Sequence, residues 1–116
     1  MSELINNLEA QGCNMKEALE RFLGNQTILE KMMLKFPNAV KPLEVLSFID
    51  EGNIEQATTN AHTIKGITAN LSLTPLYTAY TEITNLLRAG ESEKAKSLLQ
   101  ETLPVQQKII DIIDSN

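Results

Sequence analysis

The sequence predicts an all-α protein, an up-down antiparallel four-helix bundle with a short N-terminal helix packed over one end. The composition favours helices, because only 4% of the 116 residues are aromatic and there are only five glycines and four prolines. Apolar residues recur at steps of three and four along the chain, and no segment alternates convincingly with a period of two. Short connections between helices make neighbours antiparallel. At this length, residues 1–116 are expected to form a single domain.

Glycine and asparagine divide the N-terminal part of the chain. A short amphipathic segment covers residues 3–11 and is interrupted at Gly12. Asn14 and Glu17 have the spacing of a capping box, which predicts a helix from there through Leu23.

Prolines interrupt the next predicted segment. Residues 26–51 carry apolar side chains at helical spacing, and Asn25 can cap their first turn. Pro37 and Pro42 lie inside this run, and each removes a backbone donor and crowds the preceding turn. We therefore expect the helix to kink or break there.

The C-terminal half predicts three helices. The first covers about residues 54–71, and Thr74 followed by proline then looks like an N-cap before a helix that continues to about Arg88. Ser92 is the predicted N-cap of the last helix, which Pro104 should bend.

Charge and composition exclude several classes of partner. The formal net charge is −5, and no cluster of Lys and Arg suggests binding to nucleic acid or to an anionic membrane. Cys13 is the only cysteine, so no intrachain disulfide can form. The N-terminus has no signal-peptide pattern, and no apolar run approaches the ~18 residues of a membrane span. We expect a soluble, cytoplasmic protein.

The chain contains one histidine, His62, and helical geometry places it toward solvent. At roughly 100° per residue, the apolar side chains of residues 54–71 form one stripe, and His62 lies about 130° from its centre. The members of the stripe are Ile54, Ala57, Ala61, Ile64, Thr68 and Leu71.

The helical neighbours of this histidine are small. Thr58 and Thr59 lie one turn before it, Gly66 one turn after it, and Ala69 two turns after it. A glycine inside a helix costs about 1 kcal/mol relative to alanine. Such a cost is explained if another molecule must approach the ring closely.

Lys65 indicates what that molecule carries. An uncharged imidazole is a nucleophile, and the Lys65 ammonium would lie within reach of a phosphoryl group on its nitrogen. The ammonium also offers a charged donor to an anion near the ring. The pair His62 and Lys65 therefore fits a phosphoryl carrier.

Other interpretations of the histidine are weaker or stay open. A lone exposed histidine is most often an ordinary surface residue, but the small side chains around His62 argue against this interpretation. A zinc site needs three or four ligands, and the chain has one histidine and one cysteine. No nucleophile motif, P-loop or kinase glycine loop is present. A non-catalytic helical adaptor that binds through the face around His62 remains as the alternative function.

The stretch "AHTIKGITANLSL" resembles the signature of histidine-containing phosphotransfer (HPt) domains, which has the form H-x-[LI]-K-G followed by small residues and a leucine. Three flanking stretches are also similar to the family: "ALERFLGNQTILEKMMLKF", "LSFIDEGN" and "LLRAGE". The resemblance covers about residues 12–113. Ser72 departs from it, standing where the family usually has glycine, and so does Thr84, where Glu or Gln is common. The second departure puts in doubt any side-chain contact from that helix to the imidazole.

The resemblance implies a phosphorelay role. His62 would accept a phosphoryl group from the aspartyl-phosphate of a response-regulator receiver domain and pass it to another receiver. Lys65 would stabilise phosphoryl charge, and Gly66 would leave space for the partner. The chain would be no autonomous enzyme and would bind no cofactor, with Mg²⁺ carried by the partner. Partners would be receiver domains or a sensor histidine kinase, and we expect a monomer. The direction of transfer and a free-standing or kinase-associated role stay open.

Four residues are predicted to contact the partner: Met15, Thr58, Thr59 and Ala69. Apolar contact must supply most of the affinity, because an exposed ion pair contributes only about 0–1 kcal/mol. In the helix that follows Asn14, Leu19 and Phe22 are expected in the core. This leaves Met15 and Ala18 as candidates for the outward edge, with Met15 partly exposed on the same side as His62.

Overall fold

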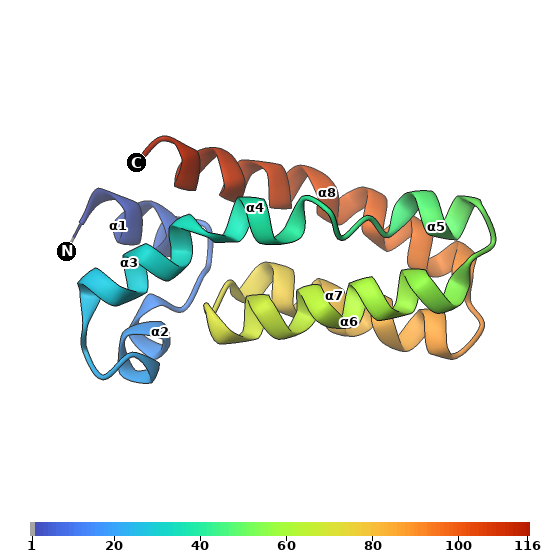
Figure 1. Ribbon diagram of the computed structural model, residues 1–116, viewed down its shortest axis with the longest axis horizontal. Coiled ribbons are helices and arrows are strands. Elements are labelled where there is room, and N and C mark those ends of the chain that lie inside the picture. The colour runs from blue at the N-terminus through green and yellow to red at the C-terminus, as the bar shows by residue number, and fades with distance from the viewer. Residues whose placement is uncertain (1) are drawn as a thin grey trace.

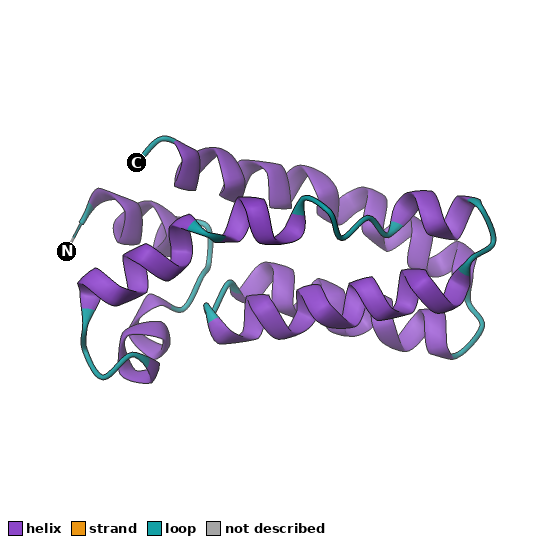
Figure 2. Ribbon diagram, in the orientation of Figure 1, coloured by secondary structure: helices purple, strands orange, loops and turns teal. Residues whose placement is uncertain are grey.

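The computed structural model describes residues 2–116, and every regular element within them is a helix (Figure 2). The molecule measures 43 × 24 × 21 Å. The helices are α1 (Glu3–Ala10), α2 (Met15–Arg21), α3 (Gln26–Leu34), α4 (Phe36–Val40), α5 (Leu46–Asp50), α6 (Ile54–Asn70), α7 (Thr74–Arg88) and α8 (Ser92–Asp114). The predicted all-α class is confirmed for the described residues.

The three longest helices run along the long axis of the molecule (Figure 1). α6 packs on α7, and α7 packs on α8. The short helices α4 and α5 lie against α8, and α5 also contacts α6. Helices α1, α2 and α3 gather at one end of the molecule, where α1 and α3 contact α8.

The core is mostly aliphatic and joins all of these helices. Its largest fully buried side chains include Tyr80 and Phe36. In α6 the predicted apolar stripe is confirmed from Ala57 to Leu71, while Ile54 at its start is only half-buried. The sequence pattern therefore gives the correct rotation of α6.

The predicted interruption by prolines is confirmed. α3 ends at Leu34, and α4 begins at Phe36 with Pro37 in its first turn, where a missing N–H does no harm. Residues 41–45, which include Pro42, are not helical. One long predicted helix is therefore three short ones.

Two predicted N-caps are wrong by one residue. α7 begins at Thr74 itself, and Leu73 is its N-cap. The hydroxyl of Thr74 instead accepts a hydrogen bond from the Asn14 N–H, at 3.2 Å, and so serves a tertiary contact. At the start of α8 the N-cap is Glu91 in place of Ser92.

α8 continues through Pro104 to its end, and the bend expected there stays a prediction. Of the helices in residues 2–116, none has the length and apolar character needed to cross a membrane.

Candidate functional site

The site is built on α6, and both ends of this helix are defined by local hydrogen bonds. The Asn53 side chain accepts from the Gln56 N–H at 3.2 Å and so caps the first turn. At the other end the Leu73 N–H donates to the Thr68 carbonyl at 2.9 Å, across Ser72 in a left-handed conformation with φ +51°. His62 lies in the middle of these 17 residues, away from either frayed end.

A buried asparagine fixes which way α6 faces. The Asn60 side chain donates to the Glu44 carbonyl at 2.6 Å and accepts from the Gln56 amide at 2.9 Å. Two residues along a helix correspond to roughly 200°, so the residue after next points almost the opposite way. His62 is accordingly exposed, as the sequence predicts.

The threonines around His62 use their hydroxyl protons within α6. Thr58 donates its hydroxyl proton to the Ile54 carbonyl at 2.7 Å, and Thr59 donates to the Glu55 carbonyl at 3.0 Å. Thr63 does the same with the Thr59 carbonyl at 3.0 Å. Because these protons are used within the helix, the surface beside the imidazole offers few free donors to water or a partner.

Space is open at Gly66, one turn beyond the histidine. A Cβ added there would meet no atom within 4 Å, so packing inside the protein does not require a glycine at this position. Gly66 is exposed, and Ala69, one turn further on, is half-buried. Glycine weakens the helix, and no contact within the described residues accounts for its presence at this position.

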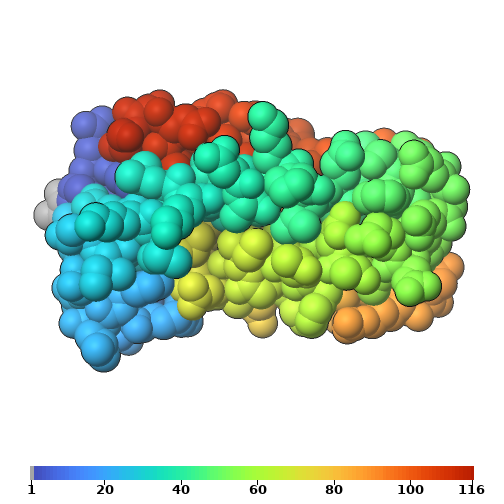
Figure 3. Space-filling view, in the orientation of Figure 1, coloured from blue at the N-terminus to red at the C-terminus, as the bar shows by residue number. Residues whose placement is uncertain are grey.

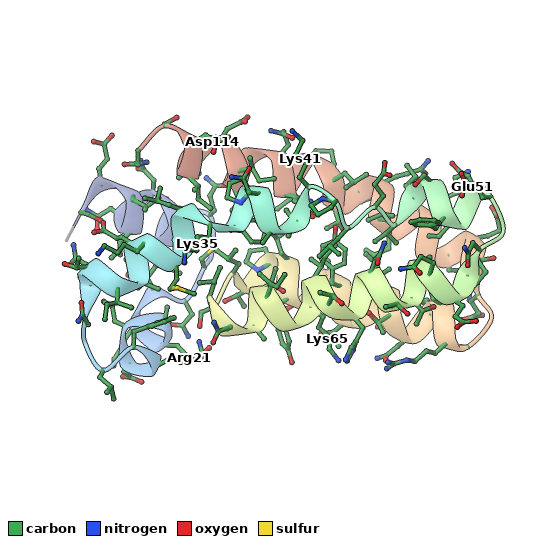
Figure 4. All side chains as sticks on the ribbon, in the orientation of Figure 1. Arg21, Lys35, Lys41, Glu51, Lys65 and Asp114 are labelled. Atoms are coloured by element: carbon green, nitrogen blue, oxygen red, sulfur yellow. The ribbon has the colours of Figure 1, made fainter. Side chains whose placement is uncertain are left out.

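Lys65 points outward from α6 (Figure 4). It takes part in none of the three ion pairs found among residues 2–116, which join Arg21 with Glu17, Lys94 with Glu91 and Lys96 with Asp50. The ammonium group of Lys65 is thus not committed to a carboxylate of the described chain and can meet an anion that arrives near His62.

A polar network beyond the histidine joins α2 to the C-terminal end of α6. The Arg21 guanidinium donates to the Asn70 carbonyl at 3.1 Å and to the Ser72 hydroxyl at 2.7 Å. Glu17 accepts from Arg21 at 3.1 Å and from the Ser72 hydroxyl at 2.8 Å. Sequence reasoning missed this network. The i, i+4 spacing of Glu17 and Arg21 signals their ion pair, but nothing local signals the contact with Ser72.

The network borders a hollow of about 360 Å³ between α2, α6 and α7, with both polar and apolar groups in its lining. Its lining includes Ala69 on α6 and Tyr77 on α7. Ala69 lies seven residues beyond His62, which is nearly two turns and about 10 Å along the same face. The hollow is therefore a neighbour of the histidine on the molecular surface.

The predicted exposure of Met15 is wrong. Met15 is only 1% exposed and Ala18 is fully buried, whereas Leu19 and Phe22 are half-buried. A helix of seven residues with three of these apolar side chains, and the fourth at its C-cap, can bury either pair. Burial of the first pair removes Met15 from any docking surface.

The two departures from the HPt pattern have different structural roles. Ser72 adopts the positive φ that glycine favours and uses its hydroxyl in the network described above. Thr84 is fully buried, and its hydroxyl donates to the Tyr80 carbonyl at 2.7 Å within α7. Thr84 therefore supplies no side-chain contact to the exposed imidazole.

The network makes stability depend on pH through Glu17. Hydrogen bonds from Ser72 and Arg21 hold the pKa of the Glu17 carboxyl below its ordinary 4.5. A carboxyl with a lowered pKa stabilises the fold above the unfolded value, and this contribution is lost as the pH falls through the folded pKa. We expect the free energy of unfolding to fall less in Glu17→Gln than in wild type as the pH is lowered below about 5. Urea unfolding at each pH measures this difference.

Glu20→Gln is the matched control for this experiment, because Glu20 lies exposed on the same helix and makes none of the ion pairs of residues 2–116. If Glu17→Gln lost as much unfolding free energy at acid pH as wild type, the network would not stabilise the fold.

Among residues 2–116, no three histidine, cysteine or carboxylate side chains come together in a group that could hold a metal ion. Comparison with known proteins adds no assignment to this geometry. No protein-family model matches the chain, and no curated protein or solved structure matches it.

Proposed function

We propose that this protein is a phosphorelay carrier of the HPt type, which accepts a phosphoryl group on His62 and passes it on. The observation that carries the proposal is the combination at α6 of an exposed histidine with a glycine that internal packing does not require. A helix surface normally carries long polar side chains. Here the helix surface beside the only histidine carries small side chains and is accessible to a second protein.

The proposed reaction needs only one nucleophile from this chain. A neutral imidazole nitrogen of His62 attacks the phosphorus of an aspartyl-phosphate on a receiver domain. A P–N bond forms, the P–O bond to the aspartyl carboxyl breaks, and the carboxylate leaves with the electron pair. The reverse sequence on another receiver discharges the carrier. Mg²⁺ would be held by the receiver, so the carrier reacts only when it is docked.

Lys65 would stabilise the charge of the transferred group. Its ammonium lies one turn from His62 and is not paired in the described chain, so it can approach phosphoryl oxygens without breaking an existing ion pair. Positioning and charge stabilisation are the main requirements of phosphoryl transfer, and both can be met at this surface.

The proposal extends to the architecture and the setting. We infer an up-down four-helix bundle in which the broken segment α3–α5 forms one layer beside α6, α7 and α8, with α1 over one end. The packing of α6 on α7, of α7 on α8, and of α5 on both α6 and α8 supports this arrangement. We propose a monomer that works in the cytoplasm, where it would meet receiver domains or a sensor histidine kinase.

The test is incubation with receiver domains that have been phosphorylated with radiolabelled donor. We expect label to move to the carrier in a form that is labile in acid and stable in base, as expected for a phosphohistidine. Lack of label with every receiver of a broad panel would contradict the proposal. Tight binding of a receiver without transfer would support the adaptor function instead.

Gly66→Gln should separate docking from folding. A glutamine side chain fits without internal clash, and replacing a helical glycine with a better helix former should raise stability by roughly 0.5–1 kcal/mol. The same side chain projects where the receiver must approach, so the KM for phosphorylated receiver should rise at least about tenfold. Melting temperature and transfer kinetics measure the two effects.

Gly66→Ala is the control, since it gives most of the gain in stability with little added bulk. Undiminished transfer in Gly66→Gln would show that the open space at Gly66 is not used by the partner.

A further inference from the structure

Five helices of the structure end in the same hydrogen-bonded turn, but two of them carry an unusual residue in it. In each turn the residue after the C-cap has a positive φ, and the next N–H donates to the carbonyl five residues before it. Glycine fills the positive-φ position of this turn at residues 12, 52 and 90. Leu23 with φ +56° and Ser72 with φ +51° fill it at the ends of α2 and α6.

The serine has a use within the chain and the leucine does not. The Ser72 hydroxyl joins Arg21 to Glu17, which explains why a serine is kept in a strained conformation. The Leu23 side chain is 94% exposed. A leucine in the left-handed region is strained, and an exposed leucine gains no burial, so neither local geometry nor packing in the described chain accounts for Leu23.

Other apolar side chains surround this turn. Leu19 and Phe22 on one side of it are half-buried, and Ile28 in the first turn of α3 is 46% exposed. The turn between α2 and α3 therefore presents a small apolar corner, consisting of Leu19, Phe22, Leu23 and Ile28. Clustered apolar groups at an exposed turn are typical of a contact with another molecule.

The apolar corner is held in a fixed position relative to the histidine helix. Arg21, two residues before Leu23, donates to the Asn70 carbonyl at 3.1 Å. Asn70 lies eight residues beyond His62, which is about 12 Å along the helix axis. Figure 4 shows Arg21 and Lys65 along the same edge of the molecule, and Figure 3 shows the α2–α3 end projecting at that edge.

The separation suits a single docked protein. A standard interface covers about 800 Å² on each partner, a patch roughly 30 Å across. A receiver centred near His62 would therefore extend over the end of α6 to α2. The intervening hollow has a mixed lining that includes Tyr77, and the apolar corner adds hydrophobic contact at the far side of this edge.

We propose that Leu23 is a specificity-determining anchor, which inserts into an apolar patch of the same receiver domain that reacts with His62. The inference rests on the proposed function. Leu23 contributes to docking and not to the chemical step, because it lies far from the reacting nitrogen. The network of Arg21, Glu17 and Ser72 holds the anchor at a set distance from His62, so that receivers with an apolar patch at that distance are selected.

The test is the kinetics of transfer from a phosphorylated receiver to Leu23→Asn. Asparagine tolerates a positive φ, so the turn is kept while the apolar side chain is removed. We expect the KM for the receiver to rise at least about tenfold, with the rate at saturation within about twofold of wild type. The melting temperature should stay the same or rise, because the strain at this position is relieved.

Val105→Asn is the matched control, since Val105 is an exposed apolar residue on α8, 39% accessible and away from α2. Leu23→Met, which keeps an apolar side chain, should restore most of the affinity. If wild type is labelled and Leu23→Asn has the same KM as wild type, the anchor is overturned and the proposed function is left intact. The anchor would also be overturned if Leu23→Asn only dissociated a dimer of this chain. If no receiver labels the wild-type protein, both the anchor and the proposed function are overturned.

Discussion

Replacing His62 with glutamine is expected to reduce label transfer from a phosphorylated receiver to background. Glutamine keeps a polar side chain of similar length but has no nucleophilic nitrogen, so no P–N bond can form. No second histidine exists to take over, because His62 is the only one in the chain. The measurement is acid-labile label on the carrier after mixing with the receiver.

The fold should be unaffected by this change. His62 is exposed, and a surface substitution normally changes stability by no more than about 0.5 kcal/mol. Binding of the receiver to His62→Gln should also persist, since the docking surface is intact. Acid-labile label on His62→Gln protein would refute the site assignment.

Lys65→Gln provides a graded comparison with that loss. Removing one accessible charge that contributes about 0–1 kcal/mol lowers the transfer rate by up to about fivefold, and not to background. The two substitutions together distinguish the nucleophile from a residue that only stabilises charge. High salt should shrink the effect of Lys65→Gln, because an accessible cation is screened.

Periodicity was sufficient to predict the rotation of α6. Seventeen residues give nearly five turns, so the buried members Ala57, Ala61 and Ile64 define one face without ambiguity. The exposure of His62 follows from that face. The open space at Gly66 follows too, because small neighbours are visible in the sequence.

The orientation of α2 could not be predicted by the same reasoning. Seven residues make two turns, and the apolar positions 15, 18 and 19, with the C-cap at 22, allow either edge to face inward. The buried edge is decided by tertiary contacts, including the hydrogen bond from the Asn14 N–H to Thr74, sixty residues away. Met15 is buried for this reason, and the apolar groups left at the surface are those near Leu23.

Local sequence predicts the asparagine caps correctly, whereas it places the caps of α7 and α8 one residue too late, at Thr74 and Ser92. Asn14 and Asn25 accept hydrogen bonds from N–H groups three residues on, as their capping positions indicate. The local sequence marks the serine in the turn after α6 only as a departure from the HPt pattern. Its role depends on Arg21, about fifty residues earlier, and no property of the local sequence indicates such a partner.

The largest loss of stability is expected from Ile83→Ala. Ile83 is fully buried on α7, the helix that packs against both α6 and α8. Removing three buried carbons leaves a cavity that helices packed on two sides cannot easily close. Such substitutions destabilise by about 2–5 kcal/mol, which corresponds to a fall in Tm of about 8–20 °C at this chain length. Urea unfolding and calorimetry give both quantities.

Val105→Ala is the matched control, because it also shortens a β-branched side chain but on the exposed side of α8. It should change stability by no more than about 0.5 kcal/mol. An equal Tm for both variants would show that Ile83 does not carry the packing inferred from its burial.

Ile83→Ala also separates the fold from the proposed chemistry. The total stability of a domain is about 5–15 kcal/mol, so most of the variant should stay folded at low temperature. His62 lies on the exposed side of α6, and its reaction depends on access by the receiver and not on the core behind it. At 10 °C the transfer rate per folded molecule should therefore equal that of wild type. A proportional loss of transfer in the folded variant would mean that the core around α7 sets the geometry of the docking surface.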